Sequence, residues 1–205
     1  MIYHFTPIEG VFLIELERRE DSRGWLTRTF CAEEFTEMGL ETNFVQSSTV
    51  FNEMCGTLRG LHYQNPPYAE TKLVRCVHGA LFDVVVDIRP ESATFGQWVA
   101  AELTGDNGCM FYLPKGCAHG FQTLVPRTEI QFQMSTPYSA EHSAGIRWND
   151  PSLNIDWPQA NPIISDKDRE WPILANNANG GPALGRHLPP AAPAFTPVEK
   201  TGSYG

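Results

Sequence analysis

The strongest constraint on the fold is a series of short segments in which apolar and polar residues alternate. Phe82–Ile88 reads F-D-V-V-V-D-I, which places its phenylalanine and isoleucine on one face and both aspartates on the other. Glu129–Met134 repeats the pattern, with glutamate and glutamine opposite isoleucine, phenylalanine and methionine. A period of two residues is typical of a β-strand with one buried face.

Segments of the same kind recur along most of the chain. Gly, Pro, Asn and Asp separate many of them at intervals of about ten residues, which favours an all-β sandwich or barrel. Helical character is limited to Ala32–Met38 and Asp166–Trp171, so we expect only a few short peripheral helices. The further candidate strands are Gly10–Leu16, Leu26–Phe30, Asn43–Val50, Lys72–Val77, Gln97–Leu103, Cys109–Leu113 and Ala118–Leu124.

Length and charge narrow the class of protein. A chain of 205 residues suits one domain that buries roughly 70% of its unfolded surface. The net charge of −9 opposes binding to phosphate backbones, so we expect no nucleic-acid partner. No apolar run approaches the roughly 20 residues of a membrane helix, and the first residues do not resemble a signal peptide. We therefore expect a soluble, cytoplasmic protein with no membrane partner.

The composition changes at residue 175. From there to residue 205, Gly, Pro and Ala supply about half of the residues, and the apolar periodicity is lost. Such a segment has too little apolar surface to support a core of its own. We therefore predict a domain over residues 1–174 and a disordered tail over residues 175–205. A linker or a partner-binding arm is the alternative interpretation of the tail.

Two polar motifs could be catalytic or structural. In L-R-G-L-H-Y-Q, at Leu58–Gln64, a regular strand places Arg59 and His62 on opposite faces, so their joint use requires a bend at Gly60. A structural histidine beside a surface arginine is the alternative. The second motif, S-D-K-D at Ser165–Asp168, could equally cap a helix or lie in solvent.

A third motif resembles part of a metal site but lacks the other ligands. The sequence L-P-K-G-C-A-H-G-F combines a Pro-Gly turn with His119 in the P-x-G-x-x-H pattern of cupin barrels. Metal cupins add a pair of histidines one residue apart and a glutamate. Here Gln64 stands where the partner of His62 is needed, although Glu70 follows. Five cysteines without C-x-x-C spacing also argue against zinc, so we expect no metal and reduced thiols.

Taken in order, the motifs resemble the dTDP-4-dehydrorhamnose 3,5-epimerase family of nucleotide-sugar enzymes. The resemblance runs from about residue 11 to residue 174. It implies a metal-free cupin barrel, which is a double-stranded β-helix or jelly roll. It also implies an enzyme of deoxysugar biosynthesis that forms a homodimer and needs no cofactor. The segments that carry it are D-S-R-G-W, L-R-G-L-H-Y-Q, K-L-V-R, F-D-V-V-V-D-I-R, S-A-T-F-G-Q-W, L-P-K-G-C-A-H-G-F, G-I-R-W-N-D-P and S-D-K-D.

The family's chemistry assigns roles to residues of this chain. A ketone at C4 of the sugar acidifies the protons on C3 and C5, because the carbanion delocalises onto oxygen. The resemblance implies His62 as the base, oriented by Asp168, and Lys72 as the cation that offsets the enolate charge. The implied substrate-binding residues are Arg23, Gln46, Arg59, Lys72, His119 and Tyr138, with Arg59 as the diphosphate contact and His119 as a helper of Lys72.

The main departure from the family is Phe132, which stands where the family has a tyrosine that protonates the face opposite the histidine. Acid assistance is worth roughly 10²–10⁴ in rate, so we expect epimerisation at one carbon of a nucleoside-diphosphate 4-keto-6-deoxysugar. The proton could come from water or from Tyr63, Tyr112 or Tyr138. A ketoisomerase, in which His62 returns the proton to a different atom, and a non-catalytic sugar-nucleotide-binding protein are the alternatives.

A second departure concerns the nucleotide. Arg19 replaces an aromatic residue that usually precedes D-x-R-G, and Arg28 replaces an acidic residue that follows it. The familiar Q-x-N is Gln46-Ser47-Ser48 here. We predict that Arg19 and Arg28 contact the substrate, and that the base or the sugar differs from that of the family's thymidine substrate.

Overall fold

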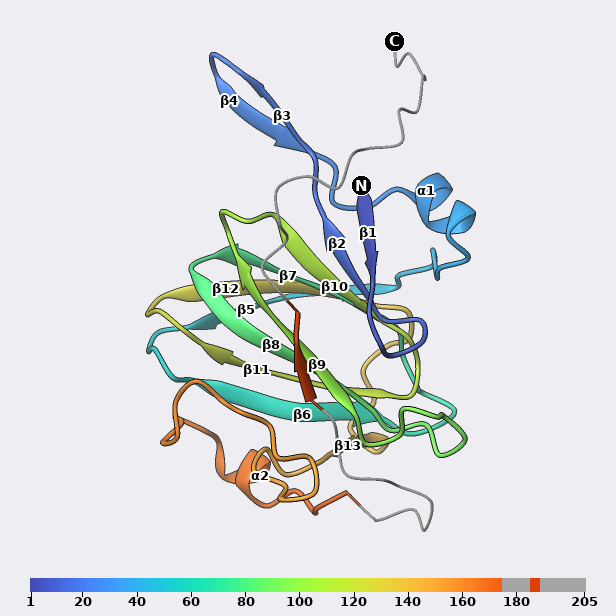
Figure 1. The fold of residues 1–205 in the computed structure, drawn as a ribbon, viewed down its shortest axis with the longest axis vertical. Helices are drawn as coiled ribbons and strands as arrows, with labels where there is room; N and C mark the ends of the chain where they lie inside the picture. The colour runs from blue at the N-terminus through green and yellow to red at the C-terminus, as the bar shows by residue number, and fades with distance from the viewer. Residues whose placement is uncertain (175–184, 189–205) are drawn as a thin grey trace.

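The computed structural model, which describes residues 1–174 and 185–188, consists mainly of two six-stranded sheets (Figure 1). The first sheet has the order β1 (Ile2–Phe5), β2 (Phe12–Glu15), β10 (Cys109–Leu113), β7 (Lys72–His78), β12 (Thr128–Met134) and β5 (Gln46–Asn52). The second has the order β13 (Ser143–Gly145), β6 (Leu58–Gln64), β11 (Cys117–Thr123), β8 (Ala80–Asp87), β9 (Trp98–Thr104) and β14 (Gly185–His187). This is the predicted cupin-type barrel.

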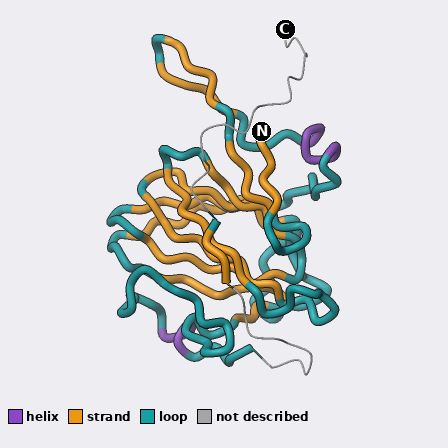
Figure 2. The backbone as a smooth tube through the Cα atoms, viewed as in Figure 1, coloured by secondary structure: helices purple, strands orange, loops and turns teal. Residues whose placement is uncertain are grey.

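Apart from connecting loops, the described chain adds one hairpin and two short helices to these sheets. The hairpin of β3 (Arg18–Asp21) and β4 (Gly24–Thr27) projects beyond the barrel (Figure 1). The two predicted helices are α1 (Ala32–Glu37) and α2 (Asp166–Arg169), and both lie at the periphery (Figure 2). Neither these nor any other helical segment in the described ranges is long and apolar enough to cross a membrane.

The main core lies between the two sheets. Val74 of β7 and Phe111 of β10 pack there with Val85 of β8 and Val99 of β9. A second cluster covers the outer face of the second sheet, and a third joins the first sheet to α1 through Phe35. Since β8 is covered on both faces, the alternation in Phe82–Ile88 does not mark a solvent-exposed face, and both aspartates of that strand are 0% exposed.

The predicted strands coincide with observed ones within a few residues, but four observed strands were not predicted. These are β1, β3, β13 and β14, which have three or four residues each and owe their conformation to a pairing partner. β3, for example, reads R-R-E-D and has no apolar face, so its sequence carries no strand signal. Its register with β4 supplies the backbone hydrogen bonds instead.

The bend that the sequence required at Gly60 is present. Gly60 has a φ of +122°, a conformation that residues with a Cβ rarely adopt. A Cβ on Gly60 would lie 2.6 Å from the Cα of Gly120 on the neighbouring strand. Pairing between β6 and β11 shifts in register next to this position. The irregular backbone brings both Arg59 and His62 to the same cavity, as the joint use of the two side chains requires.

Most of residues 175–205, where a disordered tail was predicted, lies outside the described residues. Its described part, β14, pairs in parallel with the edge strand β9, with Gly185 opposite Trp98. The Leu188 amide donates to the Ala100 carbonyl at 2.7 Å, and the His187 ring lies 5.5 Å from that of Trp98. Composition alone did not indicate this strand, because its contacts come from β9.

We predict that Gly185→Val undocks this strand. A Cβ at residue 185 would lie 2.0 Å from the Trp98 indole, so the side chain cannot be accommodated while the register is kept. Hydrogen–deuterium exchange should rise in residues 185–188 and in β9, whereas Arg186→Ala, an exposed neighbour on the same strand, should leave exchange unchanged. Unaltered protection of β9 in Gly185→Val would contradict the docking.

Candidate active site

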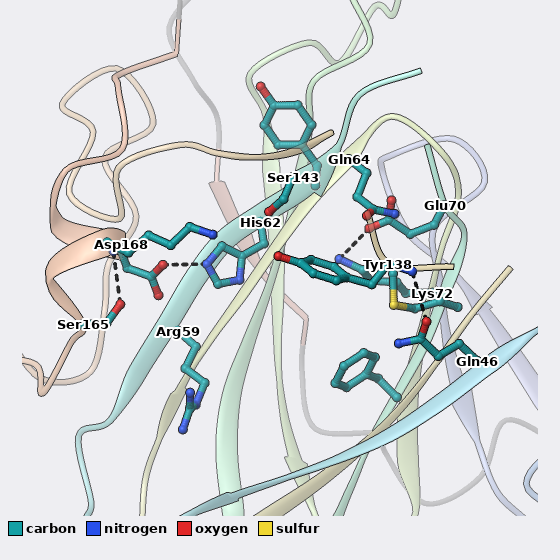
Figure 3. Close-up of a pocket in the computed structure, with 14 residues that line it drawn as sticks. Gln46, Arg59, His62, Gln64, Glu70, Lys72, Tyr138, Ser143, Ser165 and Asp168 are labelled. Atoms are coloured by element: carbon teal, nitrogen blue, oxygen red, sulfur yellow. Dashed lines mark hydrogen bonds and ion pairs between the residues drawn. The ribbon is translucent and has the colours of Figure 1, made fainter. Parts of the chain in front are cut away.

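A cavity of about 340 Å³ lies between the two sheets (Figure 3). One wall comes from the first sheet, through β5, β7 and β12, and the other from β6 and β13 of the second sheet and from α2. Most of the lining side chains are polar, which sets this end of the barrel apart from the apolar core behind it. The lining residues are Gln46, Arg59, His62, Tyr63, Gln64, Glu70, Lys72, Phe132, Met134, Tyr138, Ser143, Ser165, Lys167 and Asp168.

The centre of the site is a histidine–aspartate pair. The Nε2 of His62 lies 2.7 Å from Oδ1 of Asp168, a residue only 5% exposed. The indole N–H of Trp171 donates to the same carboxylate oxygen at 3.2 Å, and the Gly60 amide donates to Oδ2 at 3.2 Å. If Nε2 carries the proton donated to Asp168, the basic lone pair of His62 is on Nδ1.

The helix α2 places Asp168 beside a strand that lies far away in sequence. Ser165 is its N-cap, and the Ser165 hydroxyl accepts a hydrogen bond from the Asp168 amide at 3.1 Å. The segment before the helix is joined to the sheet, since the Leu58 amide donates to the Ile163 carbonyl at 2.8 Å. The S-D-K-D motif is therefore both a helix cap and part of the candidate site.

The environment of Asp168 favours its ionised form. Burial acts to raise the pKa of this carboxyl group, but the hydrogen bond to His62 and the charge of its imidazolium form act against it. The Gly60 amide and the Trp171 indole add two further hydrogen bonds, and the net pKa of Asp168 lies below its ordinary value. An ionised carboxylate can orient the imidazole and stabilise its protonated form.

Lys72 faces the cavity from the opposite wall, beside an acidic residue that the sequence did not single out for a role in this site. Its Nζ lies 2.9 Å from Oε1 of Glu70, whose side chain is 3% exposed. Figure 3 shows this ion pair across the cavity from His62 and Asp168. The sequence suggests Glu70 only as one member of an incomplete set of metal ligands. No spacing rule marks a buried carboxylate in a loop as the partner of a lysine.

His119 does not line the cavity. It lies opposite His62 in the pairing of β6 and β11, but its Nε2 contacts Oδ1 of Asp83 at 2.7 Å inside the barrel. Burial raises the pKa of Asp83, and the nearby His119 opposes that change. The predicted contact between His119 and the substrate remains a prediction.

Arg59, Gln46 and Tyr138 do line the cavity. The Nε of Arg59 donates to Asn52 at 2.8 Å, which holds the guanidinium at the cavity rim. Gln46 accepts a hydrogen bond from the Tyr138 amide at 3.0 Å. In Figure 3 the Tyr138 ring extends across the cavity with its hydroxyl towards His62.

Phe132 projects into the cavity, so this wall has no hydroxyl at that position. Among the three tyrosines considered as substitutes, Tyr63 and Tyr138 line the cavity and Tyr112 does not. The Tyr112 hydroxyl instead accepts a hydrogen bond from the Glu41 amide at 2.9 Å, near α1.

The arginines of the hairpin and the segment after it are not among the lining residues. Arg23 is 85% exposed at its side chain and pairs with Asp21 at 2.6 Å. Arg28 contacts Glu34 at 3.2 Å, and Arg19 lies on the exposed strand β3. Within one chain, the structure does not bring these three predicted substrate contacts to the cavity.

Two of the cysteines are made unreactive by burial. Burial raises the pKa of both Cys76 and Cys117 to about 12, so these thiols remain protonated. Across residues 1–174 and 185–188, no group of three or more His, Cys, Asp or Glu side chains is placed to hold a metal ion.

The lowered pKa of Asp168 predicts a pH-dependent contribution to stability. Because the folded-state pKa is depressed, this contribution is present above the unfolded value of about 3.9 and is lost as pH falls through the folded value. When the pH is lowered from 7 to about 3, the free energy of unfolding measured with urea should fall less in Asp168→Asn than in the wild type. Asp166→Asn, an exposed neighbour on α2, is the control, and equal losses in wild type and Asp168→Asn would contradict the assignment.

Comparison with known proteins agrees with this geometry. Residues 5–176 match the family described as dTDP-4-dehydrorhamnose 3,5-epimerase. A relative of that name from Sinorhizobium fredii is 42% identical over 175 residues, which cover 85% of this chain and 90% of the relative. A crystal structure of the Bacillus anthracis dTDP-4-dehydrorhamnose 3,5-epimerase with TDP and PPi bound has a TM-score of 0.82 and 41% identity, covering 84% of this chain and 99% of the other.

A similar structure carries a narrower description. It is a 3'-monoepimerase from Streptomyces bikiniensis in complex with dTDP-quinovose, with a TM-score of 0.79 and 32% identity, covering 83% of this chain and 87% of the other. The shared region ends near residue 176, so β14 lies beyond the match to the family. The family match and the high identity over most of both chains show that this chain belongs to the dTDP-4-dehydrorhamnose 3,5-epimerase family, whose members are isomerases.

Proposed function

We propose that this protein epimerises a carbon next to the ketone of a nucleoside-diphosphate 4-keto-6-deoxysugar. The observation that carries the proposal is the 2.7 Å contact between His62 and Asp168 at the wall of the cavity. A base is needed to remove the proton, and the carboxylate both orients the imidazole and stabilises its charged form. The bound TDP and dTDP-quinovose of the similar structures support a nucleoside-diphosphate sugar as the ligand.

The other lining residues supply the remaining requirements. When Nδ1 of His62 takes the proton from C3 or C5, the electron pair moves onto the C4 oxygen as an enolate. The Lys72 ammonium, 12% exposed at its side chain, offsets that charge where little water can screen it. Arg59 offers a planar pair of N–H donors to the diphosphate, with Gln46 and Tyr138 beside the sugar nucleotide.

We propose that inversion occurs at one carbon only. Phe132 stands where the family has the tyrosine that protonates the opposite face, so the second proton has to come from a substitute donor. The monoepimerase among the similar structures supports this narrower activity. A second candidate is a ketoisomerase, which the lack of a hydroxyl on Phe132 also favours, because in that reaction one base returns the proton on its own side.

The proposal predicts solvent exchange that depends on His62. With nucleoside-diphosphate 4-keto-6-deoxysugars in D₂O, NMR should show deuterium uptake at C3 or C5, and His62→Ala should reduce it by at least about 10²-fold. His4→Ala is a matched control, because His4 lies on β1 beside Glu15 and outside the cavity.

The outcome separates the candidate functions. Inversion of one centre supports the epimerase, and migration of the carbonyl signal without inversion supports the ketoisomerase. Tight binding with no exchange indicates a sugar-nucleotide-binding protein, and exchange that persists unchanged in His62→Ala contradicts the assigned base.

We also propose that the protein is a homodimer in which the β3–β4 hairpin contacts the partner. The hairpin projects from the barrel with Trp25 52% and Leu26 69% exposed, a costly arrangement for apolar side chains in water (Figure 1). A second copy would cover these side chains and bring the hairpin arginines towards a cavity that they do not reach in their own chain.

This proposal predicts twice the mass of one chain in light scattering. The double variant Trp25→Ser/Leu26→Ser should shift the protein towards monomer, whereas Phe5→Ser, an exposed aromatic on β1 outside the hairpin, should not. If the hairpin serves the partner's cavity, mixing Arg23→Ala with His62→Ala should recover part of the activity. A monomeric wild type would contradict the dimer.

A further inference from the structure

An epimerase needs a second proton-transfer group, and the structure points to one on the wall opposite His62. Inversion requires removal of a proton on one face of the carbon and delivery on the other. The base projects from β6 of the second sheet, so the donor is expected on the first sheet. This inference rests on the proposed function, since the reaction defines what the donor must do.

The wall opposite the base has few groups with a transferable proton. In the pairing of β12 with β7, Phe132 lies opposite Val74 and Met134 lies opposite Lys72. Residues directly opposite in an antiparallel pair project to the same side, so Lys72 enters the cavity next to two side chains without an acidic proton. Gln46 of β5 adds only an amide. The Lys72 ammonium is therefore the acid that β5, β7 and β12 present to the cavity.

The other protic side chains considered for this role at the cavity come from β6, from α2 or from the loop after β12. Tyr63 follows His62 on β6, and burial raises its pKa, which makes it a weaker acid. The Tyr138 hydroxyl is directed towards His62 (Figure 3). Lys167 belongs to α2 with Asp168, and its Nζ lies over the Trp171 ring, 5.2 Å from the centroid. None of these three side chains belongs to a strand of the first sheet.

Glu70 gives Lys72 a defined position. Its Oε1 accepts one of the three N–H donors of the ammonium at 2.9 Å, leaving two for a ligand. The second oxygen, Oε2, is buried without a hydrogen-bond partner, so the ion pair is the main compensation for burying this carboxylate. A lysine paired in this way is held at the wall instead of extending freely into the cavity.

We propose that Lys72, positioned by Glu70, donates the proton to the second face in place of the hydroxyl that Phe132 lacks. His62 takes the C–H proton and becomes imidazolium, and the electron pair of that bond passes into the enolate. One Lys72 N–H binds the enolate oxygen, and another is transferred to the same carbon from the opposite face as the ketone re-forms. Lys72 is left as a neutral amine, and both groups return to their starting states by exchanging protons with water.

The test measures two quantities in the variant Lys72→Met: exchange of the C–H proton with solvent, and inversion of the carbon. With a nucleoside-diphosphate 4-keto-6-deoxysugar in D₂O, His62 still removes and returns a proton on its own face. Deuterium uptake with retention should slow, because the enolate loses its cation, but inversion should fall by a further factor of about 10²–10⁴. Lys167→Met, the other lysine at the cavity, should leave the ratio of exchange to inversion unchanged.

Two further variants test the missing hydroxyl at Phe132 and the positioning of Lys72 by Glu70. Phe132→Tyr places a hydroxyl on the same wall, so the double variant Lys72→Met/Phe132→Tyr should regain inversion. Glu70→Gln should lower kcat for inversion with little change in KM or in exchange, because it displaces the donor without removing the base. A purely structural role for Glu70 predicts instead that exchange and inversion fall together.

The possible failures are distinguishable. Equal loss of exchange and inversion in Lys72→Met overturns the donor assignment and leaves the proposed function standing, because Lys72 would then act only on the enolate oxygen. Carbonyl migration without inversion in the wild type also overturns the donor assignment. Absence of His62-dependent exchange in the wild type overturns both proposals.

Discussion

The contact between His62 and Asp168 joins β6 of the second sheet to the helix α2, and both line the cavity. It connects a strand of the second sheet to a short helix 106 residues later, and the carboxylate is held by three different donors. A buried carboxylate is stable only when such donors compensate for its lost hydration. The irregular backbone at Gly60 and the cap at Ser165 both serve this compensation, since each helps to place Asp168 against the ring.

The barrel provides two walls with different chemistry. The second sheet presents the imidazole, while the first presents an ammonium held by a buried carboxylate and two side chains that donate no proton. The Lys72 and Glu70 side chains are largely buried, at 12% and 3% exposed, so water screens their charges little. Fixed charged groups on facing walls are suited to the enolate chemistry that we propose.

Sequence reasoning identified much of the fold and several of the residues that line the cavity. Alternation and turn residues located most strands of the two sheets, because strands that pack on one core share a period of two. His62, Asp168, Lys72, Arg59, Gln46, Phe132 and Tyr138 were all recovered at the cavity. Glu70 was not recognised as part of it, because nothing local distinguishes its role from that of a surface carboxylate. The strands β3 and β14 were missed since their conformation comes from pairing partners.

What the sequence determined by itself is the type of fold and the chemical groups available, because period, turns and motif order are local properties of the chain. The tertiary structure decided which groups face each other: Asp168 against His62, Glu70 against Lys72, and Asp83 inward against His119. It also left the hairpin arginines away from their own chain's cavity. These arrangements depend on register and on distant segments meeting, and such contacts are set by packing across the whole barrel.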